Sequence, residues 1–199
     1  MRARMLSLAL LLLVVGGGQA QAYAESPTDA IKRTNRRINQ LLSRKAPAGA
    51  AADKLKDQIK QEVSSFLDFT ELARLALSRH WEARTEAQRK EFVQILQDLI
   101  ERNYIKQLRA NMGYTIQYGK ESRDGETASV ATTVKVVNSK RTTELTIEYK
   151  MRRVGKRWMV YDVVTDDVSI VRNYRSQFNR IIRRESYEAL VKKMREKLL

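Results

Sequence analysis

The alternation that decides the fold lies at residues 145–152, which read LTIEYKMR. Apolar and polar side chains take turns along the whole stretch, and this period of two is typical of a β-strand with one buried and one wet face. The apolar positions are Leu145, Ile147, Tyr149 and Met151, and the polar positions are Thr146, Glu148, Lys150 and Arg152. We therefore expect an antiparallel sheet whose dry face packs against another layer.

Three more strands flank this one, separated by turns short enough for hairpins. Residues 114–118 and 128–136 precede it, with Asp124-Gly125 between them, and residues 158–164 follow after Gly155. Hairpin connections join strands that are neighbours in a sheet. The four strands together predict an antiparallel meander.

Apolar residues recur at helical spacing both before and after the strands. They predict helices over residues 28–43 and 55–63, one that begins at Asp68 and one over 85–110 before the sheet, and helices over 171–182 and 190–198 after it. The longest of these has an apolar surface wider than one narrow seam. This order of elements is that of an α+β fold, in which a helical layer packs on a twisted four-stranded antiparallel sheet.

Capping residues mark several helix starts. Asp68 with Glu71 and Thr85 with Gln88 both have the spacing of a capping box, in which the first side chain accepts a hydrogen bond from the backbone of the first turn. Ser169 stands before the first helix that follows the strands. We expect each of these residues to cap its helix.

The composition excludes several classes of site. The 199 residues include 38 Lys and Arg against 23 Asp and Glu, a net charge of +15, with one His and no Cys. Without Cys the chain has no disulfide scaffold, no thiolate nucleophile and no Cys-ligated metal, and one His excludes a multi-His metal site. No phosphate loop, dinucleotide fingerprint, zinc motif or serine elbow occurs. We expect no cofactor and no metal.

Residues 1–24 have the order of a cleaved secretory signal. A positive start is followed by an apolar run at 6–15 and by Ala22-Tyr23-Ala24 before Glu25, with a cut after Ala22 as the alternative. An apolar run of that length rises only about 15 Å as a helix, half of a hydrocarbon core of about 30 Å. We expect residues 25–199 to be a single domain that is soluble and exported.

Side chains able to do acid–base chemistry are few. His80 has no nucleophile pattern near it and is interpreted as a surface or half-buried residue. Asp166 and Asp167 are typical of a turn and a helix start. Asp162 alternates with apolar residues on one strand face, so it needs a partner, for which an Arg of the final helix is a candidate. Those apolar residues are Trp158, Val160 and Val164.

The last helices are strongly basic. Their basic residues are Arg172, Arg175, Arg180, Arg183, Arg184, Lys192, Lys193, Arg195 and Lys197. Aromatic residues follow the apolar stripe rather than the basic one, no RNA-binding signature occurs, and an export signal argues against a nucleic acid partner. Two interpretations stay open: a solvated helix face, or a docking surface for an acidic lipid or protein.

Three stretches resemble the MlaC (toluene-tolerance) family of periplasmic phospholipid-binding proteins. They are FLDFTELARLALSRHW at 66–81, TEAQRKEFVQILQDLIERNY at 85–104 and VYDVVTDDVSIVRNYRSQFNRIIRR at 160–184. The chain departs from the family pattern at two positions where the family usually has Gly: Ser78, before Arg-x-Trp, and Asp167, before Val-Ser.

The resemblance implies a helical layer over the sheet that encloses a pocket for lipid acyl chains. It also implies a periplasmic phospholipid carrier that maintains outer-membrane lipid asymmetry. Such a carrier is expected to be a monomer. It would shuttle lipid between an outer-membrane lipoprotein complex and an inner-membrane ABC transporter with an MCE-domain protein. Hopanoid-linked relatives look similar, so another lipid stays open as the cargo.

The apolar stripes supply a hypothesis for the pocket wall. The residues expected there are Trp81, Phe92, Leu96, Leu99, Tyr104, Leu145, Ile147, Tyr149, Val160, Tyr161, Val163, Tyr174 and Phe178. Two other functions stay open: that of a basic adaptor domain with a filled core, and that of a hydrolase that uses Asp162 and His80. The carrier is expected not to be an enzyme.

Overall fold

The computed structural model describes residues 25–43, 49–110, 114–138 and 141–198. The predicted signal at 1–24 lies outside these ranges. The helices are α1 (Pro27–Leu42), α2 (Ala50–Phe66), α3 (Phe69–Leu77), the 3-10 helix η1 (Ser78–His80), α4 (Glu86–Ala110), α5 (Ile170–Arg184) and α6 (Tyr187–Glu196). The strands are β1 (Tyr114–Asp124), β2 (Thr127–Asn138), β3 (Arg141–Val154), β4 (Arg157–Thr165) and β5 (Val168–Ser169).

The five strands form one sheet in the order β1-β2-β3-β4-β5, with every neighbouring pair antiparallel. The predicted α+β class and the meander are therefore confirmed. The strand count differs by one because Val168 and Ser169 pair with Thr165 and Val164 across a tight turn. A two-residue strand has too short a pattern to be recognised from periodicity.

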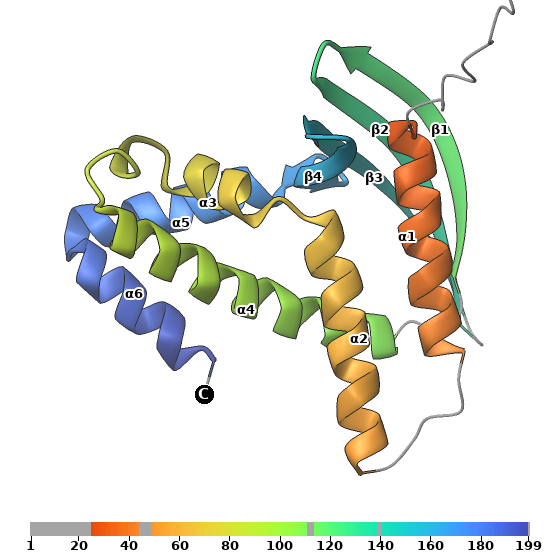
Figure 1. Ribbon diagram of the computed structural model, residues 1–199, viewed down its shortest axis with the longest axis horizontal. Coiled ribbons are helices and arrows are strands. Elements are labelled where there is room, and N and C mark those ends of the chain that lie inside the picture. The colour runs from red at the N-terminus through yellow and green to blue at the C-terminus, as the bar shows by residue number, and fades with distance from the viewer. Residues whose placement is uncertain (1–24, 44–48, 111–113, 139–140, 199) are drawn as a thin grey trace, which may run out of the picture.

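Figure 1 shows how the layers are arranged. The curved sheet lies at one end of the molecule with α1 across it, the helices α3, α4, α5 and α6 gather at the other end, and α2 stands between. The predicted caps are confirmed: Asp68 accepts from the backbone N–H of Glu71, and Ser169 accepts from that of Arg172. The hydroxyl of Thr85 accepts from the backbone N–H of Gln88. None of the described helices combines the length and the apolar composition that a membrane crossing needs.

A β-bulge in β4 reverses one sequence prediction. Met151 pairs with Val160, but Lys150 pairs with Asp162, so Tyr161 is an extra residue in the strand. Since Met151 and Lys150 point to opposite faces of the sheet, Val160 and Asp162 do so as well. The expectation that Asp162 shares a face with Trp158 and Val160 is wrong, because strict alternation fails at the bulge.

Asp162 instead fixes the start of α5. It is buried, and its two oxygens accept hydrogen bonds from the Ser169 hydroxyl at 2.6 Å and from the backbone N–H of Val171 at 3.0 Å. The predicted arginine partner is therefore replaced by a hydroxyl and a free N–H of the first helical turn. This ties the basic helix α5 to the edge of the sheet.

The two departures from the family pattern occupy positions that favour glycine. Ser78 has φ 50° and Asp167 has φ 66°, and Asp166 beside it has φ 45°. A side chain at positive φ is crowded against its own backbone, whereas glycine adopts such angles freely. At both turns the backbone therefore has a conformation suited to glycine, although another residue stands there.

The described apolar interior falls into three clusters. The largest lies among α3, α4, α5 and α6, and includes Phe92, Leu96 and Phe178. A second joins α1 and the end of α2 to the sheet, and a third joins α1 to α2. The division matters because the space between the second and third clusters is where the interior is hollow.

Candidate functional site

The candidate site is an apolar cavity between the sheet, α1 and α2, with a volume of about 300 Å³. Its wall combines members of the second and third clusters with further side chains from all four long strands. The lining residues are Thr34, Asn35, Ile38, Val63, Phe66, Leu67, Ile100, Tyr114, Ile116, Val134, Val136, Leu145, Ile147, Tyr149, Val163, Thr165 and Ile170. None of these described lining residues carries a charge. The cavity thus offers a dry surface to an uncharged, apolar ligand.

The sheet supplies one wall because its strands alternate as the sequence predicts. Ile147 and Tyr149 of β3 line the cavity, whereas Thr146 and Glu148 line a shallow groove on the other face of the sheet. Val163 of β4 faces the cavity opposite Tyr149, its partner in the ladder. The dry face of the predicted sheet is therefore the cavity wall.

The opposite wall is formed by α1, which is held over the sheet at several points. Its first turn is tied to β1, because the backbone N–H and hydroxyl of Thr28 donate to Glu121 Oε2 at 2.9 and 2.6 Å. Further along α1, Asn35 Nδ2 donates to the Tyr118 hydroxyl at 3.1 Å. Burial raises the pKa of Glu121, but the hydrogen bonds from Thr28 and Arg123 outweigh it, so the pKa lies below its ordinary value.

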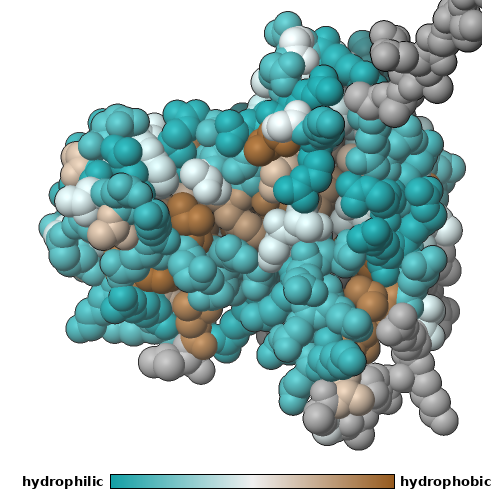
Figure 2. Space-filling model, viewed as in Figure 1, coloured by the Kyte–Doolittle hydropathy of each residue, from teal (hydrophilic) through white to brown (hydrophobic). Residues whose placement is uncertain are grey.

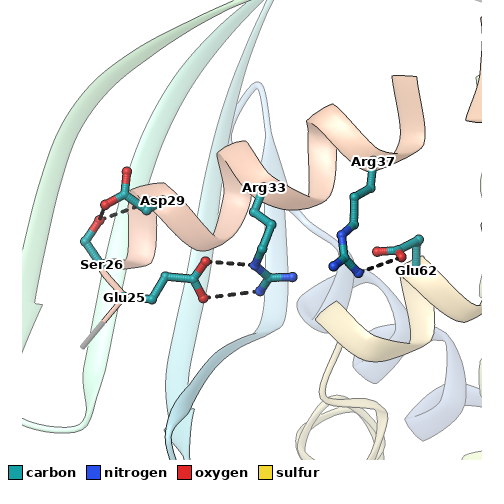
Figure 3. A network of polar contacts seen from close by, with 6 residues as sticks. All are labelled: Glu25, Ser26, Asp29, Arg33, Arg37 and Glu62. Carbon is teal, nitrogen blue, oxygen red and sulfur yellow. Dashed lines mark hydrogen bonds and ion pairs between the residues drawn. The ribbon is translucent and has the colours of Figure 1, made fainter. Parts of the chain in front are cut away.

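An ion pair joins α1 to α2 (Figure 3). Arg37 Nη1 lies 3.0 Å from Glu62 Oε1, while Arg33, one turn earlier, pairs with Glu25 at 2.8 Å. Both pairs are partly exposed, so each contributes at most about 1 kcal/mol. Figure 2 shows apolar surface in the gap between α1 and α2. At the surface the two helices are thus joined by one weak ion pair, and beneath it by the third apolar cluster.

Tyr149 is the aromatic residue of the cavity wall with the most perturbed acidity. Burial raises the pKa of its hydroxyl to about 12, because a phenolate would be poorly solvated there. Burial also raises the pKa of Tyr114, whose hydroxyl donates to Asn39 Oδ1 at 2.7 Å. Both phenols stay neutral at physiological pH, which keeps the cavity free of charge.

The predicted wall residues separate into groups. Leu145, Ile147, Tyr149 and Val163 lie around the cavity. Six residues lie in the helical cluster instead, where they pack on one another: Trp81, Phe92, Leu96, Leu99, Tyr174 and Phe178. Phe92 and Phe178 meet edge to face with ring centroids 5.5 Å apart. Their packing on one another does not support placing those six in the cavity wall. The sequence could not show this, because an apolar stripe looks the same whether it contacts a ligand or another helix.

The three remaining predicted residues lie elsewhere. Val160 is fully buried in the cluster beneath α1. Tyr161 is the half-buried bulge residue and does not line the cavity. Tyr104 belongs to α4, but its side chain lies outside the described part of the structure. Of the long helix, Ile100 contributes to the described wall.

Sequence reasoning missed the contributions of α1, α2 and the first two strands. Ile38 and Val63 stood on predicted helical stripes, and Ile116, Val134 and Val136 on predicted strands. The strand residues could have been predicted from the sheet, because residues of neighbouring strands on the same face as Ile147 must line the same cavity. What sequence could not show was which helix covers that face.

The acid–base candidates have separate structural roles. His80 lies in η1 beside α5, where its Nε2 is 3.1 Å from Asn179 Oδ1. Asp162 is not among the residues that line the groove around His80, and both its oxygens are used at the start of α5. Within the described ranges, no group of three or more His, Asp or Glu side chains is placed to hold a metal ion. This arrangement does not support the hydrolase reading.

Comparison with known proteins gives two kinds of likeness. The MlaC protein family model matches residues 32–196 of the chain. The phospholipid-binding protein from Ralstonia solanacearum, solved in complex with a phospholipid, is similar with a TM-score of 0.70 and 19% sequence identity, over 88% of this chain and 96% of that chain. An NTF-2-like protein of unknown function from Shewanella oneidensis MR-1 has a TM-score of 0.39 and 12% identity, over 70% of this chain and 98% of that chain, a similarity too low to indicate a shared fold.

Proposed function

The chain belongs to the MlaC family, and on that premise we propose that it is a phospholipid carrier whose cavity between α1, α2 and the sheet holds acyl chains. The observation that carries the proposal is the uncharged wall of that cavity. The phospholipid-bound Ralstonia protein of the same fold supports a ligand of this class. Carriage requires binding and release but no covalent chemistry, so the protein acts as a binding protein and not as an enzyme.

The physical task explains why a hollow interior is useful. A phospholipid with about 30 tail methylenes would face a cost on the order of 20 kcal/mol on entering water, at about 0.8 kcal/mol for each methylene. A cavity with an apolar wall removes most of this cost. Because the chains then pass from one apolar medium to another, loading and unloading can be nearly balanced.

The polar headgroup stays outside the cavity in this proposal. Burying an unpaired phosphate costs far more than leaving it in water, and the described wall offers no charged partner. A volume of about 300 Å³ is at the lower end for ligand pockets. Two full acyl chains therefore need α1 and α2 to move apart, and the partly exposed pair between Arg37 and Glu62 is a weak contact across that gap.

The biological route follows from the family and is also part of the proposal. After cleavage of the signal at 1–24, residues 25–199 would work in the periplasm as one domain. They would exchange phospholipid with an outer-membrane lipoprotein complex and with an inner-membrane ABC transporter that carries an MCE-domain protein, and so maintain outer-membrane lipid asymmetry. A hopanoid would also suit the uncharged wall, and identifying the cargo distinguishes the two lipids.

A tryptophan placed in the cavity tests the proposal. Ile147→Trp fills space on the dry face, and Thr146→Trp places the same side chain on the wet face of the same strand. Each protein is purified without detergent and denatured, and the released lipid is identified by mass spectrometry. We expect wild type and Thr146→Trp to carry phospholipid and Ile147→Trp to carry little, with similar unfolding temperatures for all three.

Equal lipid in the two variants would contradict the assignment of the cavity. Absence of lipid from all three proteins would favour the adaptor reading, in which the basic surface alone is functional. Leu99→Trp gives a further contrast, because Leu99 lies in the filled helical cluster. There a larger side chain should lower the unfolding temperature rather than displace lipid.

A further inference from the structure

A groove rich in arginine lies on the helical end of the molecule, between η1 and α5. It has a volume of about 440 Å³. Its lining residues are Leu77, Ser78, Arg79, His80, Arg172, Arg175, Ser176, Asn179 and Arg183. Four are arginines and none is a carboxylate, and the residues of the cavity wall are a different set. The groove is therefore a second feature that the cargo site does not explain.

The positive charge of this groove is not balanced by acidic side chains. Within the described part of the chain, none of its four arginines takes part in an ion pair. Elsewhere on the helical end, basic residues do have acidic partners: Arg89 pairs with Glu82, and Lys193 pairs with Glu185. Guanidinium groups gathered without acids repel one another. An anion bound among them would relieve that repulsion.

Several of the groove's side chains are held in place by neutral acceptors. Arg175 Nε donates to the backbone carbonyl of Leu75 at 2.9 Å, and Arg172 Nη2 donates to that of Asp167 at 3.0 Å. Arg79 and His80 both contact Asn179 Oδ1. A carbonyl orients a guanidinium without cancelling its charge. The groove thus holds oriented donors that keep their positive charge.

The composition of the groove indicates what binds there. Protein interfaces are usually centred on apolar and aromatic anchors, whereas Leu77 is the one large apolar residue in this lining. Arginine matches the oxygens of a phosphate with two parallel hydrogen bonds. Exposed Arg180 and Arg184 extend the basic surface along α5. This pattern fits an extended surface of phosphates better than a folded protein.

We propose that the arginine groove docks the protein on an anionic phospholipid surface, with a headgroup phosphate lying among Arg79, Arg172, Arg175 and Arg183. Attraction to such a surface grows with each basic residue brought near it and falls as salt screens it. The docking face is distinct from the cargo cavity, so this inference holds or fails separately from the proposed cargo.

The test compares two double variants that lose the same charge. Arg79→Gln with Arg183→Gln, the groove variant, removes two exposed arginines from the groove. Lys120→Gln with Lys156→Gln, the sheet variant, removes one exposed lysine from β1 and one from the turn between β3 and β4. Partitioning is measured by co-sedimentation with vesicles of phosphatidylcholine, alone or with an equimolar amount of phosphatidylglycerol, at low and high salt. We expect the wild type to bind the anionic vesicles and to be released by salt.

The groove variant should bind these vesicles about 30-fold more weakly, at about 1 kcal/mol for each arginine, and the sheet variant should bind nearly as well as wild type. Equal losses in the two variants would overturn the proposal, as would equal binding to neutral and anionic vesicles. Displacement of the vesicles by millimolar glycerol phosphate would assign the groove to a free phosphate compound instead. Tighter binding to polyglutamate than to vesicles would assign it to an acidic protein.

Lipid content separates this outcome from the proposed function. The groove variant should still release phospholipid on denaturation, because its changes lie away from the cavity wall. Loss of vesicle binding with bound phospholipid retained is the expected pair of results. Vesicle binding by a protein that carries no lipid would instead support the docking face and reject the cargo.

Discussion

Replacing Ser78 with glycine should stabilise the protein. Ser78 ends α3 with φ 50° and ψ −122°, a combination that residues with a side chain rarely adopt. Backbone strain of this kind costs about 1–3 kcal/mol. The added freedom of glycine in the unfolded chain offsets about 0.5–1 kcal/mol of the relief. The side chain of Ser78 is exposed, so little packing is lost.

The expected gain is about 1 kcal/mol in the free energy of unfolding, which raises the unfolding temperature of a chain this size by about 2–4 °C. Urea unfolding followed by circular dichroism measures it. Ser176→Gly, the same change inside α5, is the matched control and should instead cost about 0.5 kcal/mol, because glycine is a poor helix former. A destabilised Ser78→Gly protein would refute the argument from strain. Asp167→Gly should shift stability in the same direction but by less, since Asp tolerates positive φ better than Ser.

Three further changes test contacts that tie helices to the sheet or lie in the cavity wall. Asp162→Ala leaves the Ser169 hydroxyl and a helical N–H without an acceptor and should lower the free energy of unfolding by about 2–4 kcal/mol in urea, whereas a loss under 1 kcal/mol would contradict the anchoring role. Glu121→Gln weakens the hydrogen bonds from Thr28, so it should lower the free energy of unfolding by about 1 kcal/mol at neutral pH. In the wild type, stability should be lost as pH falls through the lowered pKa of Glu121, and the variant should not show that loss. A variant that keeps the wild-type acid dependence would argue against this. The raised pKa of Tyr149 favours its neutral form in the folded state, so the free energy of unfolding should fall as pH rises from about 10 to about 12. Tyr149→Phe should make that fall shallower in alkaline unfolding curves. An unchanged curve would show that Tyr149 does not cause the loss of stability.

Periodicity predicted most of the architecture because local patterns decide the elements. The alternation around Ile147 gave both the strand and its dry face, and the capping residues Asp68 and Ser169 gave helix starts that the structure confirms. The bulge at Tyr161 could not be predicted, since an extra residue in one strand is visible only from its pairing with the next. That single residue moves Asp162 to the other face and changes its partner.

The cavity was predicted only in part, for a related reason. Neither the helical stripe with Phe92 nor the strand stripe with Ile147 shows in the sequence whether it meets another side chain or an open space, yet the first packs in a filled cluster and the second lines the cavity. Whether a stripe contacts a neighbour or a space depends on how α1 and α2 sit over the sheet. Those are contacts between elements distant in sequence, and no local pattern encodes them.

The central claim is that the cavity between α1, α2 and the sheet holds a bound phospholipid. The direct measurement is the mass of the intact protein, exported by cells, purified without detergent and analysed under non-denaturing conditions. A species heavier than the bare chain by one phospholipid, which disappears when the protein is unfolded, is the predicted result. A single species with the mass of the bare chain would contradict the claim.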